Sequence, residues 1–284
     1  MVQLIKSLSQ NCDNKTKKSK ISSRGADGVR EWSAKSLNVQ VGCEHCCLYC
    51  APRASAARFK RKNPRKWDVV EVNKSALKKS IPKISGRIMF PTSHDISPSN
   101  AHYAIPYLER LLAEGNEVLV VTKPHLSVVK EMCKTLAPYR KQLLFRFTIG
   151  SSKSKILKFW EPGAPSFKER YKSLVYAHSH GFQTSVSCEP CLDADIEPLI
   201  EKLLPHVADA IWIGRPNMLM ARTSINGYKD NETRERTRKL LSELSDDWVR
   251  NLYKKYKSNR RIKWKAGLKR VLGLPLSTEN GLDI

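Results

Sequence analysis

The stretch that decides the fold is Leu37-Asn-Val-Gln-Val-Gly-Cys-Glu-His-Cys-Cys-Leu-Tyr-Cys-Ala-Pro-Arg53. Its first five residues alternate apolar and polar side chains, which predicts a short strand over residues 37–41. Gly42 ends this pattern, and a run of eight residues then contains four cysteines, Cys43, Cys46, Cys47 and Cys50. In a chain without secretory features, cysteines at this density indicate bound metal before they indicate disulfide bonds.

Three of these cysteines can hold an iron–sulfur cluster in either of two combinations. Cys43, Cys47 and Cys50 are separated by three and then two residues. With Cys46 in place of Cys47, the separations become two and then three. Thiolates are the usual ligands of such clusters, and three of them on one compact loop can each reach a different iron of the same small cage.

A structural zinc site is the alternative interpretation of the same loop. Cys43 and Cys46 would form one half of such a site, and Cys188-Glu-Pro-Cys191 would supply the other half. The distance along the chain does not exclude this pairing. The strand, the glycine and the aromatic residue around the cysteines favour the iron–sulfur cluster.

The charge balance is strongly basic. The 284 residues include 51 Lys and Arg against 27 Asp and Glu, a net charge of +24. Such a surface attracts polyanions, of which nucleic acid is the commonest inside cells, although a solubilising surface has the same composition. We expect a soluble cytoplasmic protein, because no apolar run approaches the roughly 18–20 residues of a membrane span and residues 1–20 lack a signal-peptide core.

Short apolar segments alternate with helical patterns over residues 37–217. The expected strands are 37–41, 87–90, 117–122, 143–149, 183–187 and 209–214. The expected helices between them are 104–114, 125–136, 166–180 and 195–204. Strands joined by helices form a parallel sheet, and the polar residues that follow each strand indicate a site at the carboxyl ends of the strands.

Both ends of the chain differ from this central domain. Residues 1–36 are expected to form a basic arm, and residues 218–284 a basic helical extension. Between residues 250 and 270 there are ten Lys and Arg and no acidic residue, interleaved with Tyr253, Tyr256 and Trp264. This composition suits contacts with single-stranded or flipped-base nucleic acid, but the aromatic spacing also fits a seam in the core.

The spacing of Cys43, Cys47 and Cys50, with Tyr49 before the last cysteine, resembles the cluster motif of radical S-adenosylmethionine (SAM) enzymes. Further motifs are similar to the spore photoproduct lyase-like branch of that superfamily: Thr92-Ser93 with Asp95, Lys123 after a strand, Glu161-Pro-Gly-Ala-Pro-Ser166 with Glu169-Arg170, and Glu189-Pro190. The resemblance covers residues 37–217. It implies a partial (β/α)6 TIM-type barrel that binds a [4Fe–4S] cluster and SAM.

Carried over residue by residue, the resemblance implies a role for each matching position. The cluster ligands would be Cys43, Cys47 and Cys50, and the cofactor contacts would be Tyr49, Ser93, Lys123, Thr148 and Glu189. Reductive cleavage of SAM to a 5′-deoxyadenosyl radical would need an electron donor such as flavodoxin or ferredoxin. The substrate implied is nucleic acid, through repair or base modification; the alternatives are a peptide or protein substrate, or a non-catalytic nucleic-acid-binding protein stabilised by zinc.

The chain departs from spore photoproduct lyases at two positions. Pro91 stands where those enzymes have a hydrogen-donating cysteine, and Ala51 stands where they have a tyrosine after the last cluster cysteine. Cys188 and Cys191 follow a strand on the same expected edge of the barrel, so they are candidate catalytic thiols that replace the missing donor. The other interpretations are that they bind a second cluster or metal, or that they simply pack, because cysteine is often buried and inert.

Overall fold

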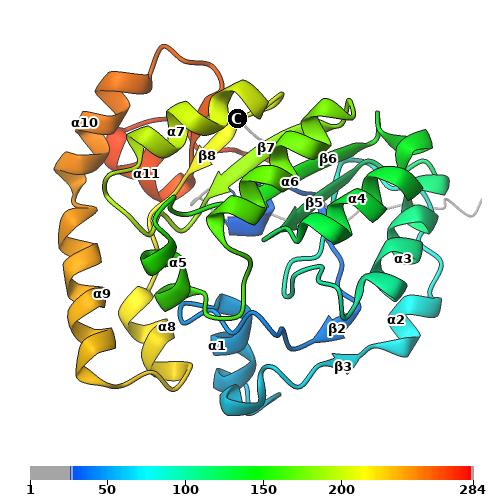
Figure 1. Cartoon of the computed structure of the whole chain (residues 1–284), viewed down its shortest axis with the longest axis horizontal. Helices are drawn as coiled ribbons and strands as arrows, with labels where there is room; N and C mark the ends of the chain where they lie inside the picture. The colour runs from blue at the N-terminus through cyan, green and yellow to red at the C-terminus, as the bar shows by residue number, and fades with distance from the viewer. Residues whose placement is uncertain (1–25, 27, 283–284) are drawn as a thin grey trace, which may run out of the picture.

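The computed structural model describes residue 26 and residues 28–282. Most of the expected N-terminal arm, residues 1–36, therefore lies outside the described residues. The described part forms a seven-stranded sheet covered by helices, together with a separate two-stranded ribbon (Figure 1). Within it, no helix has both the length and the apolar composition needed to cross a membrane.

The main sheet is parallel throughout, and its strands follow one another in chain order. Its strands are β1 (Lys35–Ser36), β4 (Ile88–Phe90), β5 (Val118–Thr122), β6 (Leu143–Thr148), β7 (Gln183–Cys188), β8 (Ile211–Ile213) and β9 (Ile262–Trp264). Helical crossovers join β4 to β8 in turn, as parallel neighbours require. The expected parallel α/β fold is confirmed, and among the described residues the sheet has two ends, β1 and β9, instead of closing into a ring.

Helices pack on the sheet, and Figure 1 shows α4 and α6 in front of it. The α-helices are α1 (Ala51–Arg58), α2 (Lys74–Lys78), α3 (Ala101–Ala113), α4 (Leu126–Thr135), α5 (Ser154–Trp160), α6 (Phe167–Ser179), α7 (Glu197–Leu203), α8 (Leu219–Ile225), α9 (Asn231–Glu243), α10 (Asp246–Tyr256) and α11 (Ala266–Leu272). The 3-10 turns are η1 (Gly28–Glu31), η2 (Pro64–Lys66), η3 (Ala137–Tyr139) and η4 (Leu204–His206). Local sequence sets the helix starts: Ser166, for example, caps α6 by accepting a hydrogen bond from the Glu169 amide.

Strand β6 shows how the period of two divides the core. Phe145 and Phe147 belong to the large cluster beneath the helices, whereas Leu144 joins a smaller cluster with Trp32 and Trp212 on the other face of the sheet. The Arg146 guanidinium is fully buried on that second face, 4.6 Å from the ring centre of Trp32. All six β6 residues are buried, so the middle of the sheet is covered on both faces.

The strand expected over residues 37–41 is not one strand, and this prediction was wrong in detail. Only β1 pairs with β4, while β2 (Gln40–Val41) pairs antiparallel with β3 (Glu71–Val72) outside the main sheet. The Asn38 side chain explains the break, because its oxygen accepts hydrogen bonds from the backbone amides of Thr92 and Ser93, both at 2.8 Å. The Asn38 side chain thus bonds the amides of Thr92 and Ser93, which the backbone of a longer β1 would otherwise bond. The chain therefore leaves the main sheet after β1 and pairs with β3 instead.

The seventh strand, β9, was missed because it comes from the segment expected to be a helical extension. Ile262 and Trp264 are buried, and the Lys265 amide bonds to the Ile213 carbonyl at 2.9 Å. The Lys265 ammonium then reaches Glu31 at 3.0 Å and Glu189 at 3.3 Å. The C-terminal segment is therefore part of the sheet, while the division of the chain at residue 217 stays a prediction.

A buried ion pair joins the start of α6 to the loop that follows α5. The Arg170 and Glu161 side chains are both fully buried, with Nη2 and Oε2 2.5 Å apart. Arg170 also donates to the carbonyls of Pro165 at 2.8 Å and Thr148 at 3.2 Å. Burial raises the pKa of Glu161, but the Arg170 and Lys123 charges outweigh it and leave the pKa below its ordinary value. Both groups are therefore charged, and neither can be removed alone without leaving an unbalanced charge.

We expect Arg170→Met to lower the free energy of unfolding by about 3–5 kcal/mol, because it leaves the buried Glu161 carboxylate without its partner. Adding Glu161→Gln should recover part of that loss, since the uncompensated charge is gone. The matched control is Lys239→Met, which removes an exposed pair with Glu243 and should change stability by less than about 1 kcal/mol. Denaturant unfolding measures all three, and an Arg170→Met loss no larger than the control's would contradict the interpretation.

Candidate active site

A cavity of about 400 Å³ lies at the carboxyl ends of the strands. It contains every residue that the sequence predicted as a cluster ligand or cofactor contact: Cys43, Cys47, Tyr49, Cys50, Ser93, Lys123, Thr148 and Glu189. These residues follow or end five different segments of the chain, so the fold brings them together. Apolar walls are supplied by Trp32, Trp67, Met89, Val121 and Pro190, among others.

Two glycines let neighbouring backbone approach the cysteine loop. Gly42 has a φ of +102°, and a Cβ there would lie 2.7 Å from the Trp67 carbonyl oxygen. A Cβ at Gly163 would lie only 2.3 Å from the Glu44 carbonyl oxygen. No residue with a side chain fits either position without moving the backbone. The loop is therefore held between the segment around Trp67 and the segment after α5.

The thiols of the loop are neutral in the protein alone. Burial raises the pKa of Cys43 to about 12 and that of Cys50 to about 11, and it also raises the pKa of Cys47 well above its ordinary value. Binding of a metal centre would therefore release protons, because thiolates are the ligating form. These thiols are buried but border one cavity, so a metal centre bound there can replace their protons.

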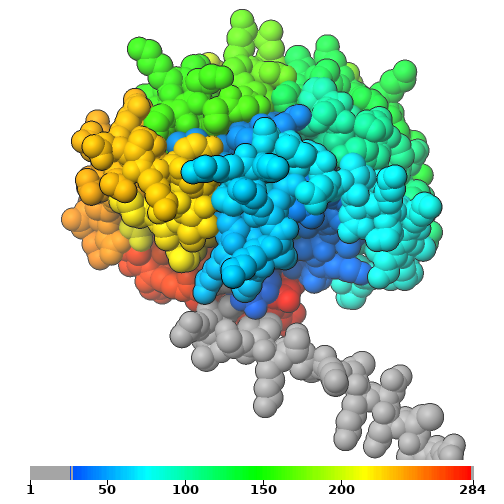
Figure 2. Space-filling view, turned by 90° about the horizontal axis from the view of Figure 1, so that it is seen from below, coloured from blue at the N-terminus to red at the C-terminus, as the bar shows by residue number. Residues whose placement is uncertain are grey.

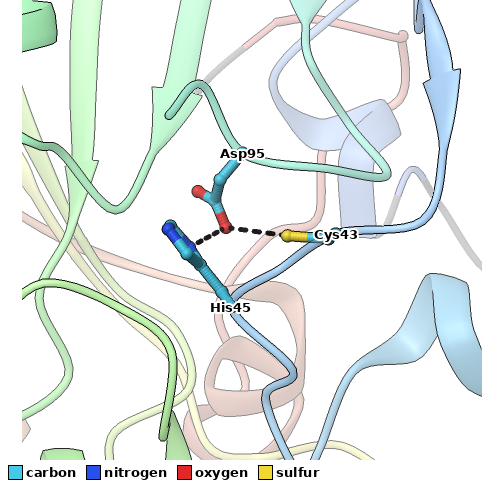
Figure 3. Close-up of side chains that lie close together, drawn as sticks. All are labelled: Cys43, His45 and Asp95. Carbon is cyan, nitrogen blue, oxygen red and sulfur yellow. Dashed lines mark hydrogen bonds and ion pairs between the residues drawn. The ribbon is translucent and has the colours of Figure 1, made fainter. Parts of the chain in front are cut away.

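Asp95 connects the cysteine loop to the end of β5. Its Oδ2 lies 2.9 Å from the His45 Nδ1 and 3.9 Å from the Cys43 sulfur (Figure 3). Its Oδ1 accepts hydrogen bonds from the Thr122 hydroxyl at 3.0 Å and the Lys123 amide at 2.6 Å. The sequence placed Asp95 within a motif but assigned it no role.

Asp95 and Lys123 stabilise each other in their charged forms. Their charged groups lie 3.5 Å apart. Burial raises the pKa of Asp95, but Lys123 and His45 bring it well below the usual value. Burial lowers the pKa of Lys123, but Asp95 and Cys47 raise it overall. The cavity thus contains a fixed ammonium that can bind a carboxylate.

Tyr49 points its hydroxyl away from the cavity. The hydroxyl donates to Glu161, the carboxylate already paired with Arg170. Tyr49 is largely buried and its ring lines the cavity, with the Lys123 ammonium 5.9 Å from the ring centre. The buried Tyr49–Glu161–Arg170 chain therefore fixes the cysteine loop relative to α6.

Two basic side chains near Glu189 were not expected. Lys265 reaches its carboxylate from the C-terminal segment, and Arg222 of α8 also lines the cavity. Burial lowers the pKa of Arg222, opposed in part by Glu189. Neither residue carried a sequence signal, because each belongs to a segment whose position at the cavity depends on the tertiary fold.

The structure does not bring Cys188 and Cys191 to the cavity. Both are fully buried and absent from its lining, and the Cys191 thiol donates to the Cys188 carbonyl at 3.2 Å. Burial raises the pKa of Cys188 to about 12, which disfavours its reactive thiolate. Among the described residues, neither cysteine belongs to a group close enough to hold a metal ion. A catalytic role for them stays a prediction that this geometry does not support.

The aromatic residues of the 250–270 run serve the core. Tyr256 and Trp264 are buried, and Tyr253 packs edge-on against Trp264 with ring centres 5.5 Å apart. Of the two interpretations left open by the sequence, the core seam is the one observed. Base stacking on these three rings would require them to be exposed.

Sequence comparisons found nothing: no family model and no curated protein matches the chain. Solved structures do match. A spore photoproduct lyase variant with dinucleoside spore photoproduct has a TM-score of 0.51 at 13% identity, covering 81% of this chain and 75% of that one. A second lyase variant, with bound AdoMet and the same dinucleoside, has a TM-score of 0.50 at 16% identity, covering 69% and 61%.

Streptococcus suis SuiB bound to its precursor peptide SuiA also matches. Its TM-score is 0.51 at 13% identity, covering 84% of this chain and half of the SuiB chain. These identities are too low to transfer an activity, but three-dimensional similarity over most of the chain establishes the architecture. The chain has the partial-barrel fold of the radical SAM enzymes.

Proposed function

We propose that this chain is a radical SAM enzyme that acts on nucleic acid. The observation that carries the proposal is the cavity: three cysteines, a charged lysine, two hydroxyls and a glutamate, predicted from motifs spread over residues 43–189, all line it. A lone cysteine motif would be weaker support, because metal-binding cysteines occur in many folds. The fold similarity to spore photoproduct lyase and SuiB supports the same class.

The donor set suits a cluster better than a single ion. Among the described residues, Cys43, Cys47 and Cys50 do not form a group with all sulfurs within 4.8 Å of one another. A single ion needs its ligand atoms close together, whereas a cluster takes each thiolate on a different iron. The four-cysteine zinc site is disfavoured too, since Cys188 and Cys191 lie away from the cavity.

When bound, the cluster would supply the single electron that splits SAM into methionine and a 5′-deoxyadenosyl radical. The chain itself would bind and orient. Lys123 offers an ammonium to the SAM carboxylate, and Ser93 and Thr148 offer hydroxyls that donate or accept. The apolar walls, including Trp67 and Met89, exclude water from the space where hydrogen transfer would occur.

The route by which hydrogen returns to the product differs from that of spore photoproduct lyase. Pro91 and Ala51 both line the cavity at the positions where those enzymes have a cysteine and a tyrosine. The side chains of proline and alanine have only C–H bonds, so they lack the weaker S–H or O–H bond from which a thiol or phenol donates a hydrogen atom. The proposed reaction is therefore hydrogen abstraction from a nucleic-acid unit without donation from these two positions.

A basic, solvent-exposed rim supports a polyanionic substrate. The end of α1 and η2 carry exposed basic residues: Arg58, Lys60, Arg61, Arg65 and Lys66. This segment lies between Ala51 and Trp67, which both line the cavity. Figure 2 shows the light-blue region that contains it on one face of the molecule, next to the yellow region of α8. Phe59 is 65% exposed between Arg58 and Arg61, and an exposed ring flanked by arginines suits contact with a base and its phosphates.

Metal content tests the cluster directly. After anaerobic reconstitution we expect about four irons and four sulfides per chain, lost on Cys43→Ala, Cys47→Ala or Cys50→Ala. Cys46→Ala is the matched control from the same loop and should retain the cluster. Loss in Cys46→Ala with retention in Cys47→Ala would instead identify the other ligand set. A reconstituted wild-type protein that forms no deoxyadenosine from SAM with reductant would contradict the enzyme proposal.

Salt dependence tests the substrate class. Single-stranded DNA or RNA binding should weaken steeply with salt, because each phosphate contact releases counterions. Arg58→Gln/Lys60→Gln/Arg61→Gln should reduce the slope of log affinity against log salt by about 2–3, near one per lost contact. Lys134→Gln/Lys141→Gln removes exposed charge elsewhere and should leave the slope nearly unchanged. Absence of binding at low salt would remove the nucleic-acid proposal and favour a peptide substrate.

A further inference from the structure

A pair of histidines lies where the cysteine loop meets the start of α4. His45, within the loop, is fully buried, and His125 stands directly before α4 with its side chain 19% exposed. Their Nε2 atoms are 3.0 Å apart. The Glu44 carboxylate belongs to the same group, whose three ligand atoms all lie within 4.8 Å of one another.

We propose that Glu44, His45 and His125 bind a zinc ion beside the cysteine loop. Two imidazole nitrogens and a carboxylate are a donor set that zinc accepts, with water in a fourth position. Zinc–nitrogen bonds of roughly 2.0–2.1 Å in a tetrahedral site place two nitrogens about 3.3 Å apart. The observed separation of 3.0 Å is within a few tenths of an ångström of that value.

Each of the three ligands already has a partner that orients it. The His45 Nδ1 lies 2.9 Å from Asp95, so its proton is on that nitrogen and Nε2 presents a lone pair toward His125. The Ser99 hydroxyl donates to Glu44 at 3.0 Å. The Glu169 carboxylate lies 3.6 Å from the His125 Nδ1. Carboxylate-oriented histidines of this kind are typical of metal sites and are not needed for packing.

The orienting group at His125 is itself fixed. Glu169 accepts a hydrogen bond from the Leu126 amide at 3.1 Å, and its own amide is capped by Ser166. The site therefore joins the cysteine loop, the start of α4 and the start of α6. A metal here would tie Glu44 and His45, which stand between Cys43 and Cys46, to two helices. We assign it a structural role in holding the loop.

This zinc site is independent of the proposed function, since it uses no cysteine and requires no cluster. It also differs from the alternative zinc site of the sequence analysis, which would use Cys43 and Cys46 with Cys188 and Cys191. A protein without enzymatic activity could still contain it, and a radical SAM enzyme could lack it. The two proposals therefore stand or fall on different measurements.

Zinc binding to the full chain after cluster reconstitution tests the proposal, with a competing chelator to set the free zinc concentration. We expect one zinc per chain, bound with about 100-fold or more lower affinity in His125→Ala, and about tenfold lower in Glu169→Gln, the orienting residue. The control His180→Ala removes an exposed histidine elsewhere and should change nothing. Circular dichroism should be unchanged in His125→Ala, which shows that folding is intact.

Cobalt substitution in the Cys43→Ala/Cys47→Ala/Cys50→Ala chain provides a second readout that does not depend on the cluster. Cobalt bound by nitrogen and oxygen shows visible bands without the intense near-ultraviolet band of a thiolate ligand, and these bands should disappear on adding His125→Ala. The proposal would be overturned if the wild-type protein binds no zinc, or if His125→Ala binds zinc with the same affinity as wild type. It would also be overturned if cobalt in the triple cysteine variant gives a thiolate band in place of the expected spectrum.

Discussion

The site depends on one buried carboxylate, Asp95, because it is the point where the cysteine loop meets the sheet. One of its oxygens holds the end of β5 through Thr122 and the Lys123 amide, and the other faces His45 and Cys43. A buried carboxylate is stable only when its charge is compensated and its lone pairs are satisfied. The Lys123 ammonium compensates the charge of the buried Asp95 carboxylate, and the carboxylate in turn holds Lys123 in place through the Lys123 amide. The same contacts place an ammonium in the cavity.

The C-terminal part of the chain supports this arrangement from the other side. The Asn226 side-chain amide donates to the carbonyls of Leu48 and Cys50 at 2.9 and 3.0 Å, and the Tyr228 hydroxyl contacts Cys46. Lys265 holds Glu189 from beyond β9. The contacts of Asn226 and Tyr228 join the cysteine loop to residues more than 170 positions further along the chain. The contact of Lys265 connects the far end of the sheet to the cavity. The segment is therefore required to shape the site, whatever else its positive charge contacts.

Much of the sheet was predictable, as was the position at the cavity of the eight residues named from motifs, because buried strands and motif spacing are local properties of the sequence. The predictions failed where a single side chain or a distant partner decides the outcome. Asn38 ends β1 by bonding backbone amides, which no hydrophobic pattern reveals. Strand β9 has the sequence Ile-Lys-Trp within a run of Lys and Arg, so it offers only two apolar residues and no continuous apolar pattern. Lys265 looked like a surface charge, and only its partners Glu31 and Glu189 explain its burial.

Charge and shape place different demands on a nucleic-acid substrate, and together they limit how it would bind. The exposed positive charge of the α1–η2 segment lies outside the cavity, while the cavity combines apolar walls with a few ionic groups, both acidic and basic. Phosphates are costly to bury without matching cations, so the backbone of a polymer would stay at the rim. The same cavity of about 400 Å³ would also have to hold the cluster and SAM, so at most one unit of the polymer would reach into it. Enzymes that modify a base inside a pocket face the same constraint and solve it by extruding that nucleotide or by using single strands. The geometry thus favours an unpaired or flipped nucleotide over an intact duplex.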